Sequence, residues 1–323
     1  MSTMENYDHI PFSYCINDTL TIQSHNPPSP IPKSGLIQRA TSVGQDQSLS
    51  PIELCLQNPP LPGSDGNNFV SIKLIEEINV GHGKRAQIFV VRCMNSFNSS
   101  YPPTDQDMVA KIYDPFYHDF DEDSLLGADY DYTHECAAYT HLSDLQGSVI
   151  PRFFGSYTLK TRIGDRFRLA RLILVEQING LSMDRLNPET FSKEERQDIM
   201  KQIVDGESSL YMKNVCHEDL RPQNVVVQRS DSQTLRIVII DLGKSIIGRS
   251  RNPSNSRDES RYLPGVAISL YSDGTSIMTV MLTFTNGLTG HGKRGLRFNT
   301  RRTRLQLQRN NENYGRSMTG CWR

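Results

Sequence analysis

The stretch from His217 to Gly243 constrains the fold and chemistry of this chain more than any other part of the sequence. It starts with a polar loop, His-Glu-Asp-Leu-Arg-Pro-Gln-Asn, and continues through two apolar runs, residues 225–227 and 237–240, with the composition of short strands. Polar side chains suited to binding phosphate or a metal ion flank these runs: Asp219, Arg221, Asn224 and Asp241. A hairpin of the two runs brings them to one end of a small sheet. Oxygen ligands suit Mg²⁺, so the stretch predicts a site for a divalent cation and phosphate beside a hydroxyl nucleophile.

Overall charge indicates no particular partner, because 35 basic and 36 acidic side chains nearly cancel over 323 residues. This length fits one or two domains with a buried core. The charges are distributed unevenly, since residues 114–135 are acidic and the chain after Gly290 is basic. A basic tail can contact nucleic acid or acidic membrane, but a solvated, disordered end is the simpler interpretation. We therefore expect no nucleic-acid partner.

The cysteine pattern favours a reducing compartment. The six cysteines are scattered and include no C-x-x-C pair, which argues against a zinc site and against a disulfide framework. No apolar run approaches the roughly 18 residues that span a bilayer. The N-terminus lacks the basic segment and apolar run of a secretory signal. We therefore expect an intracellular protein, cytoplasmic or nuclear, without a membrane span.

Three segments differ in composition. Residues 1–68 are rich in Ser, Pro, Asn and Gln, and their sparse apolar residues follow neither a helical nor a strand period, so we predict a disordered leader. Residues 69–287 carry the periodic apolar patterns of a folded domain. Residues 288–323 show no core-forming pattern, and we predict a disordered basic tail.

The folded domain begins with predicted strands and one helix. Five apolar runs have strand character and together predict a small antiparallel sheet: residues 70–75, 88–91, 108–113, 149–157 and 168–175. Residues 132–145 have helical spacing that places Glu135 on the inward face. From residue 180 the pattern is helical, with a capping box from Ser192 to Glu195 that starts a long helix. Residues 277–284 predict a further, buried helix.

Two features of the first part of the domain suggest phosphate binding. Gly81 and Gly83 form a G-x-G turn between strands, where glycine lets backbone amides approach phosphate oxygens. A fuller G-x-G-x-x-G match, Gly290–Gly295, follows a predicted helix and has no strand after it, so we regard it as coincidental. Lys111 lies in an otherwise apolar strand, where an unpaired ammonium is costly. It either reaches solvent from an edge strand or pairs with Glu135 and phosphate, and the order of elements favours the second interpretation.

These elements occur in the order found in protein kinases: a glycine turn, a strand lysine, a helix glutamate, an acid–amide loop and a second acid. The family pattern is H-R-D-L-x-x-x-N followed by D-F-G, which residues 217–224 and 241–243 resemble. The resemblance implies an α+β, two-lobed fold. Its N-lobe, about residues 69–176, would hold a five-stranded antiparallel sheet and one helix. Its C-lobe, about residues 177–287, would be mostly helical and incomplete.

The resemblance also implies roles for residues that bind nucleotide. Gly81 and Gly83 match the loop that covers the phosphates of ATP. Lys111 matches the strand lysine that contacts the α- and β-phosphates, and Glu135 matches its helix partner. Glu176 lies in the segment Leu-Val-Glu-Gln, which resembles the hinge whose backbone holds adenine.

The resemblance implies catalytic and metal-binding roles for residues of the stretch from His217 to Gly243. Asp219 matches the aspartate that accepts the substrate hydroxyl proton, and Arg221 takes the place of the catalytic-loop lysine. Asn224 and Asp241 match the residues that hold Mg²⁺ ions bridging the phosphates of ATP.

Several positions depart from the family pattern. Ala86 replaces the third glycine, and Leu242 replaces the Phe of D-F-G. Glu218 replaces the Arg that pairs with an activation-loop phosphate, so regulation by such a phosphate is not expected. No clear A-P-E follows Gly243, and residues 263–265 are the nearest remnant.

The leading functional hypothesis is an ATP-dependent phosphotransferase that acts on protein Ser/Thr hydroxyls, with ATP and a protein substrate as partners. Small-molecule kinases of the same architecture are a variant, which the D-L-G motif and the two-glycine loop disfavour. A catalytically weak or inactive nucleotide- or partner-binding module is the first alternative. A truncated, degenerate copy with an unstable core is the second. The sequence leaves the substrate and the oligomeric state open.

Overall fold

The computed structural model describes residues 14–31, 49–96, 102–104, 106–117, 124–230, 232 and 234–248. The described residues form an α+β protein in two compact units. The first unit runs to Gln177 and includes Leu242–Lys244, and the second comprises Ile178–Asp241 and continues from Ser245.

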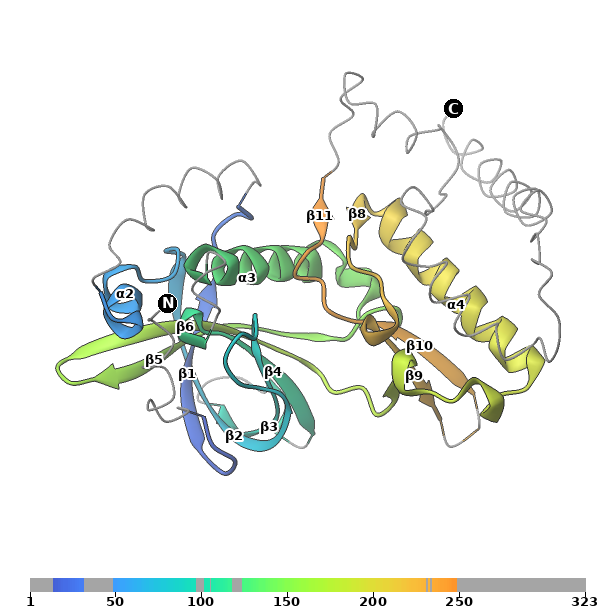
Figure 1. Cartoon of the computed structure of the whole chain (residues 1–323), viewed down its shortest axis with the longest axis horizontal. Helices are drawn as coiled ribbons and strands as arrows, with labels where there is room; N and C mark the ends of the chain where they lie inside the picture. The colour runs from blue at the N-terminus through green and yellow to red at the C-terminus, as the bar shows by residue number, and fades with distance from the viewer. Residues whose placement is uncertain are drawn as a thin grey trace, which may run out of the picture. The chain divides into compact units, whose positions relative to one another are not determined.

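A closed antiparallel barrel is the centre of the first unit (Figure 1). Its strand order is β1-β2-β3-β4-β6-β5. The strands are β1 (Thr19–Asn26), β2 (Ser64–Asn79), β3 (Gln87–Ser96), β4 (Asp107–Tyr113), β5 (Phe153–Ile163) and β6 (Arg166–Glu176). Alternate side chains of a strand point to opposite faces, so Val70, Ile72 and Leu74 of β2 are buried in the core while their neighbours are more exposed.

The prediction that residues 1–68 form a disordered leader is wrong where the structure describes them. Strand β1 pairs with both β2 and β5 and makes the barrel six-stranded, where we predicted a five-stranded sheet. Helix α2 (Pro51–Gln57) starts at Ser50 with a complete capping box to Glu53. Ile22 and Cys55 are buried in the core, at 0% and 3% exposed. The mostly polar composition of this segment hid these buried positions.

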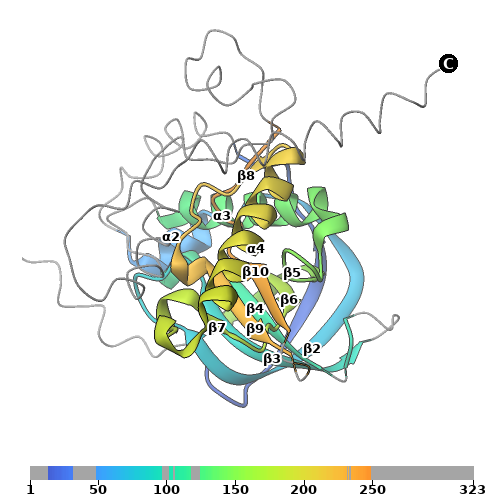
Figure 2. The same ribbon diagram turned by 90° about the vertical axis from the view of Figure 1, so that its right-hand side faces the viewer.

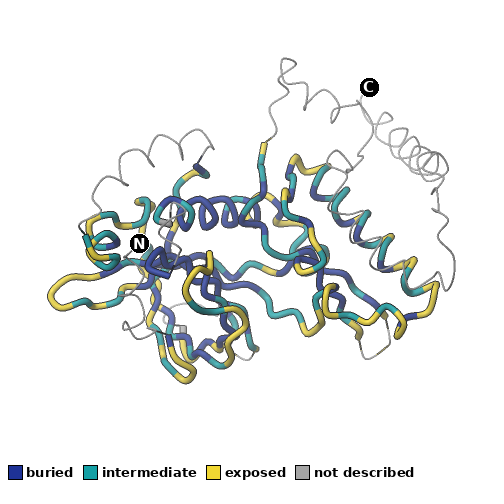
Figure 3. Tube along the Cα trace, viewed as in Figure 1, coloured by how far each residue is buried: buried dark blue, intermediate teal, exposed yellow. Residues whose placement is uncertain are grey.

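Helix α3 (Ser124–His141) packs against β4 and β6 and is buried along most of its length (Figure 3). It begins earlier than the predicted residue 132 and ends before residue 145, where a separate 3₁₀ turn, η3 (Ser143–Leu145), follows. Another 3₁₀ turn, η1 (Pro115–Tyr117), follows β4.

A charged cluster is buried beside the barrel core. Asp114 Oδ1 accepts from Arg168 Nη1 at 2.8 Å and from the Phe116 amide at 3.1 Å, and Asp114 Oδ2 accepts from Tyr14 Oη at 2.6 Å. The Asp114 and Arg168 side chains are 0% and 2% exposed. Burial raises the pKa of the Asp114 carboxyl, while the Arg168 cation and these hydrogen bonds act in the opposite direction. The cluster links the N-terminal segment to the end of β4.

His25 of β1 gives the first unit a pH-dependent stability. Burial and the nearby Arg171 cation lower the pKa of His25 to about 4, although Asp65 opposes the shift. An unfolded histidine titrates near pH 6.5. Between pH 6.5 and 4 the unfolded chain therefore binds a proton at His25 that the folded chain does not, so acidification lowers the free energy of unfolding.

We expect His25→Asn to flatten the pH dependence of unfolding between pH 7 and 5 by up to about one proton per molecule. Asparagine does not titrate, yet it can retain the hydrogen bond that His25 Nδ1 makes with Tyr132 Oη at 2.6 Å. Urea unfolding at each pH measures the slope. Parallel curves for the two proteins would contradict this assignment.

The second unit is built around helix α4 (Lys193–Met212), which lies along strand β10 (Figure 2). The predicted capping box is confirmed: Ser192 Oγ accepts from the Glu195 amide at 3.1 Å, and Glu195 Oε2 accepts from the Ser192 amide at 2.8 Å. The remaining elements are β7 (Leu181–Ser182), η4 (Met183–Arg185), η5 (Pro188–Thr190), β8 (Val215–Cys216), η6 (Pro222–Asn224), β9 (Val225–Arg229), β10 (Leu235–Ile239) and β11 (Ile246–Ile247). Strands β9 and β10 pair antiparallel, as the hairpin prediction required.

Several predictions lie outside the described residues. They concern the A-P-E remnant at 263–265, the helix at 277–284, the glycine segment 290–295 and the tail 288–323. Among the helices of the described ranges, none combines the length and the apolarity needed to cross a bilayer.

Candidate active site

Lys111 and Glu135 form a buried ion pair in the first unit. Lys111 Nζ donates to Glu135 Oε2 at 2.5 Å, and the two side chains are 10% and 1% exposed. Strand β4 presents the lysine, and helix α3 presents the glutamate on its inward face. The alternative of an edge lysine reaching solvent is excluded, because β4 is hydrogen-bonded on both sides, to β3 and β6.

Tyr113 also contacts this ion pair, and the sequence did not lead us to expect it there. Its hydroxyl donates to the same Glu135 Oε2 atom. The signal was available, because Tyr113 follows Lys111 by two residues and therefore shares its face of β4. Two donors on one carboxylate oxygen fix Glu135 against β4.

The glycine turn between β2 and β3 has the backbone that glycine permits, with φ of 120° at Gly81 and 73° at Gly83. Both amides donate within the protein. The Gly81 amide donates to Gln87 Oε1 at 2.7 Å, and the Gly83 amide donates to the Tyr117 carbonyl at 2.7 Å. A phosphate that used these amides would have to replace both acceptors.

Arg85 connects the same turn to helix α3. Its Nε and Nη2 atoms donate to the two carboxylate oxygens of Asp131 at 2.6 and 2.8 Å. Asp131 lies one helical turn before Glu135, so this bidentate pair joins the turn to the helix that carries Glu135.

Glu176, the expected adenine contact, ends strand β6. Its amide donates to the Arg152 carbonyl at 2.8 Å, and its Oε2 atom accepts from the Arg152 amide at 3.0 Å. The Glu176 amide is therefore hydrogen-bonded to Arg152 rather than available to a ligand in this structure.

The loop from His217 to Asn224 in the second unit is held by its own hydrogen bonds. His217 is 3% exposed; its Nδ1 atom accepts from the Asp219 amide at 3.3 Å, and its Nε2 atom bonds the Ile240 carbonyl at 3.0 Å. Asn224 Nδ2 donates to the Asp219 carbonyl at 2.8 Å, and the Asn224 carbonyl accepts from the Ile240 amide at 2.9 Å. Asp219, Asn224 and the residue before Asp241 are thus brought together at one end of the β9–β10 hairpin.

Arg221 pairs with the acid of this loop. Its Nε atom lies 2.8 Å from Asp219 Oδ1, and its Nη2 atom donates to Asp219 Oδ2 at 2.9 Å. The Arg221 side chain is 50% exposed and the Asp219 side chain is 12% exposed. A hydroxyl that approached Asp219 would compete with the guanidinium for the carboxylate.

Left-handed backbone occurs near both ends of the stretch from His217 to Gly243. Four non-glycine residues have positive φ within the described ranges, and two of them are Glu218, at 59°, and Asp241, at 65°. Such conformations are strained for residues with a side chain and persist where surrounding contacts enforce them, often at functional sites. In the first unit, a Cβ added at Gly243 would lie 3.4 Å from Asp131 Cβ and 3.5 Å from Glu135 Oε2, so this glycine packs beside the Glu135 carboxylate.

The donor atoms fit the magnesium that the resemblance implies. The hydrogen bond from Asn224 Nδ2 leaves its amide oxygen as the atom that could ligate a cation, and Asp241 offers a carboxylate. Among the residues that the structure describes, no three His, Cys, Asp or Glu side chains are grouped to hold a metal ion by themselves.

The lysine–glutamate pair of the first unit and the acid–amide loop of the second have the residue types found in protein-kinase sites. The family model described as "Protein kinase domain" matches residues 140–269, which is less than half of the chain. The chain therefore contains a protein-kinase-like domain. The match includes Glu176, Asp219, Arg221, Asn224 and Asp241. No curated protein matches the chain.

Proposed function

We propose that the chain is an ATP-dependent phosphotransferase that moves the γ-phosphate to Ser or Thr hydroxyls of a protein. The observation that carries the proposal is the buried Lys111–Glu135 pair. Both residues precede the segment 140–269 that matches the kinase family, so the pair supports the proposal independently of that match.

In this proposal the first unit corresponds to the N-lobe and the second belongs to the C-lobe. Lys111 holds the α- and β-phosphates, with its ammonium oriented by Glu135. Asn224 and Asp241 hold Mg²⁺, and the hinge near Glu176 receives adenine. Bound Mg-ATP supplies the transferred group and the cations that neutralise its charge.

In this proposal Asp219 and Arg221 act on the substrate hydroxyl that receives the phosphate. Asp219 orients the substrate hydroxyl and accepts its proton, and its side chain is 12% exposed. Arg221 gives up its contact with the Asp219 carboxylate when the hydroxyl binds. Its guanidinium then supplies positive charge beside the transferred phosphate. The scattered cysteines, without a C-x-x-C pair, support an intracellular site of action.

A nucleotide- or partner-binding module without turnover is the second candidate. The Arg221 guanidinium binds both carboxylate oxygens of Asp219, the proposed base. The Gly81 and Gly83 amides are hydrogen-bonded within the protein. Both observations describe a site that must rearrange before transfer. Binding of Mg-ATP without transfer would favour this module.

Nucleotide binding is the first test. We expect Mg-ATP to raise the melting temperature of the full chain, and Lys111→Met to weaken the affinity about tenfold, because one charge-assisted phosphate contact of about 1.4 kcal/mol is lost. Thermal-shift titration measures both. Lys160→Met, at a strand lysine that is 46% exposed, is the matched control and should behave as the unaltered protein does. No stabilisation of the unaltered protein at millimolar Mg-ATP would contradict the proposal.

A further inference from the structure

An N-terminal brace, consisting of residues 14–31 and 49–63, is attached firmly to the barrel. Strand β1 pairs with β2 and β5. Ser156 Oγ of β5 donates to the His25 carbonyl at 2.6 Å, and Arg171 Nη2 of β6 donates to the Leu61 carbonyl at 3.0 Å. The brace is therefore fixed to the same barrel that presents Lys111.

The brace is also hydrogen-bonded to helix α3 at three positions. The Leu61 amide donates to the Asp129 carboxylate at 3.0 and 3.1 Å. His25 Nδ1 and Tyr132 Oη lie 2.6 Å apart, and His134 Nε2 lies 2.9 Å from the Ile31 carbonyl. The helical residues Asp129, Tyr132 and His134 are 7%, 1% and 8% exposed, so these bonds are shielded from water.

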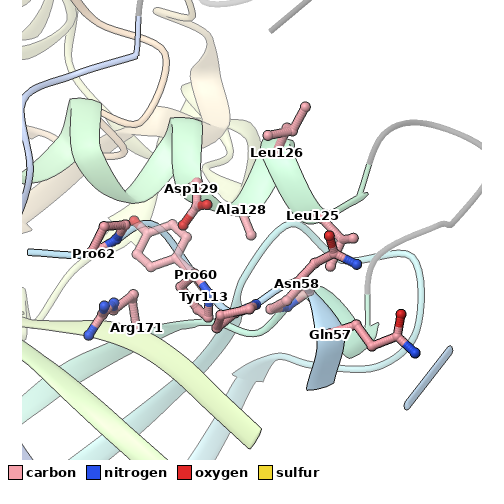
Figure 4. A pocket seen from close by; sticks show the side chains of 12 residues that line it. Gln57, Asn58, Pro60, Pro62, Tyr113, Leu125, Leu126, Ala128, Asp129 and Arg171 are labelled. Carbon is pink, nitrogen blue, oxygen red and sulfur yellow. The ribbon is translucent and has the colours of Figure 1, made fainter. Parts of the chain in front are cut away.

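A pocket lies between the brace and the start of α3. It has a volume of about 550 Å³ and is lined by Asn58, Pro60 and Pro62 of the brace and by Leu125 and Ala128 of the helix (Figure 4). The polar bonds at Asp129, Tyr132 and His134 connect the two elements beside this pocket.

A continuous set of contacts leads from the brace to the ion pair. Tyr132, bonded to His25, packs edge-on against Tyr113 with ring centroids 5.8 Å apart. The Tyr113 hydroxyl donates to Glu135, which accepts from Lys111. Tyr132 and Glu135 are three residues apart on α3 and therefore lie on neighbouring positions of one helix face.

We propose that the brace is a positioning element for the nucleotide site: it holds α3 at the depth and rotation at which Glu135 meets Lys111. Tyr132 and His134 are its positioning residues, through their bonds to His25 and Ile31. The inference rests on the proposed function insofar as it concerns nucleotide affinity. Its structural half, that the brace fixes α3, does not depend on any ligand.

The test removes two of the three side-chain bonds and keeps the ring volume. Tyr132→Phe/His134→Phe deletes the bonds of Tyr132 and His134 to the brace in the full chain and leaves the Asp129 carboxylate bonded to the Leu61 amide. Thr140→Val is the matched control, because Thr140 lies on the same helix and bonds only the Cys136 carbonyl of that helix, at 2.9 Å. Tyr132→Phe/His134→Gln is the rescue variant, since a glutamine amide can replace the Nε2 contact to Ile31. Tyr132→Phe alone serves if the double variant does not melt cooperatively.

Two readouts separate the structural role from the nucleotide role. Hydrogen exchange of the 124–141 backbone, measured without nucleotide, should be about tenfold faster in the double variant, while exchange in α4 stays unchanged. Mg-ATP affinity should fall about tenfold if the fraction of molecules with α3 in place falls to about a tenth. The rescue variant should lie between the double variant and the unaltered protein, and the control should match the unaltered protein.

Unchanged exchange in the double variant would overturn the inference whatever the nucleotide result. Faster exchange of α3 with Mg-ATP affinity unchanged would overturn its link to the nucleotide site. If the unaltered protein does not bind Mg-ATP, the proposed function fails, and the exchange measurement still decides whether the brace holds α3.

Discussion

Asp219→Asn is expected to lower phosphate transfer by roughly 10²–10⁴-fold, the usual contribution of a positioned general base, while the affinity for Mg-ATP changes little. In the proposed mechanism the carboxylate accepts the hydroxyl proton, and an amide of the same shape cannot accept it. The loop should keep its form, because its bonds to His217 and Asn224 use the Asp219 amide and carbonyl, and an asparagine oxygen can still accept from Arg221.

Single-turnover transfer from Mg-ATP to a general acceptor protein, or to the chain itself, measures this effect. Asp198→Asn is the matched control, since Asp198 is an exposed acid of α4 whose side chain bonds only Gln202 of the same helix. If Asp219→Asn transferred phosphate at the rate of the control, the proposed role of Asp219 as the general base would be contradicted.

Asp114→Ala should destabilise the first unit by about 3–5 kcal/mol, because it leaves the Arg168 guanidinium buried without its counter-ion. The same change also removes the acceptor of the Tyr14 hydroxyl, and with it an anchor of the brace. A loss of this size is a large share of the roughly 5–15 kcal/mol that stabilises a typical domain. Urea unfolding at pH 7 is the measurement.

Two comparison variants make the Asp114 result specific. Asp205→Ala removes an acid from an ion pair whose side chains are 72% and 51% exposed, and such pairs contribute about 0–1 kcal/mol. Asp114→Ala/Arg168→Met should recover part of the loss, since removing both partners of a buried pair leaves no uncompensated charge. Equal midpoints for Asp114→Ala and Asp205→Ala would contradict the account of the buried cluster.

The parts of the fold that the sequence predicts are those set by short-range patterns. The strands at 70–75, 88–91 and 108–113, the Ser192 capping box and the 225–229/235–239 hairpin depend on neighbouring residues, and the structure contains all of them. The Lys111–Glu135 contact was predictable from the order of the elements, a strand lysine followed by a helix whose period places Glu135 on its inward face.

Strand β1 was missed because its partners are distant in the chain. Ile22 pairs with Val70 and with Leu159, and no local pattern contains that information. Averaging over a polar, proline-rich segment also concealed the alternation of Leu20 and Ile22. The capping box from Ser50 to Glu53 is the same signal that identified α4, so helix α2 could have been predicted from the sequence.

Within the site, sequence could assign residue types to roles but not the contacts that compete with those roles. The Arg221–Asp219 pair depends on side-chain rotamers, and the contact of the Gly83 amide with the Tyr117 carbonyl depends on how the turn folds onto η1. These contacts decide whether the site is ready for transfer, and they distinguish an enzyme from a binding module more sharply than the motifs do.

Transfer of labelled γ-phosphate by the purified full chain tests the central claim most directly. The account predicts that the unaltered protein incorporates label from Mg-ATP into protein Ser or Thr, and that Asp219→Asn does so roughly 10²–10⁴-fold more slowly. Absence of transfer by the unaltered protein, under conditions in which it binds Mg-ATP, would contradict the claim that this kinase-like domain is a phosphotransferase.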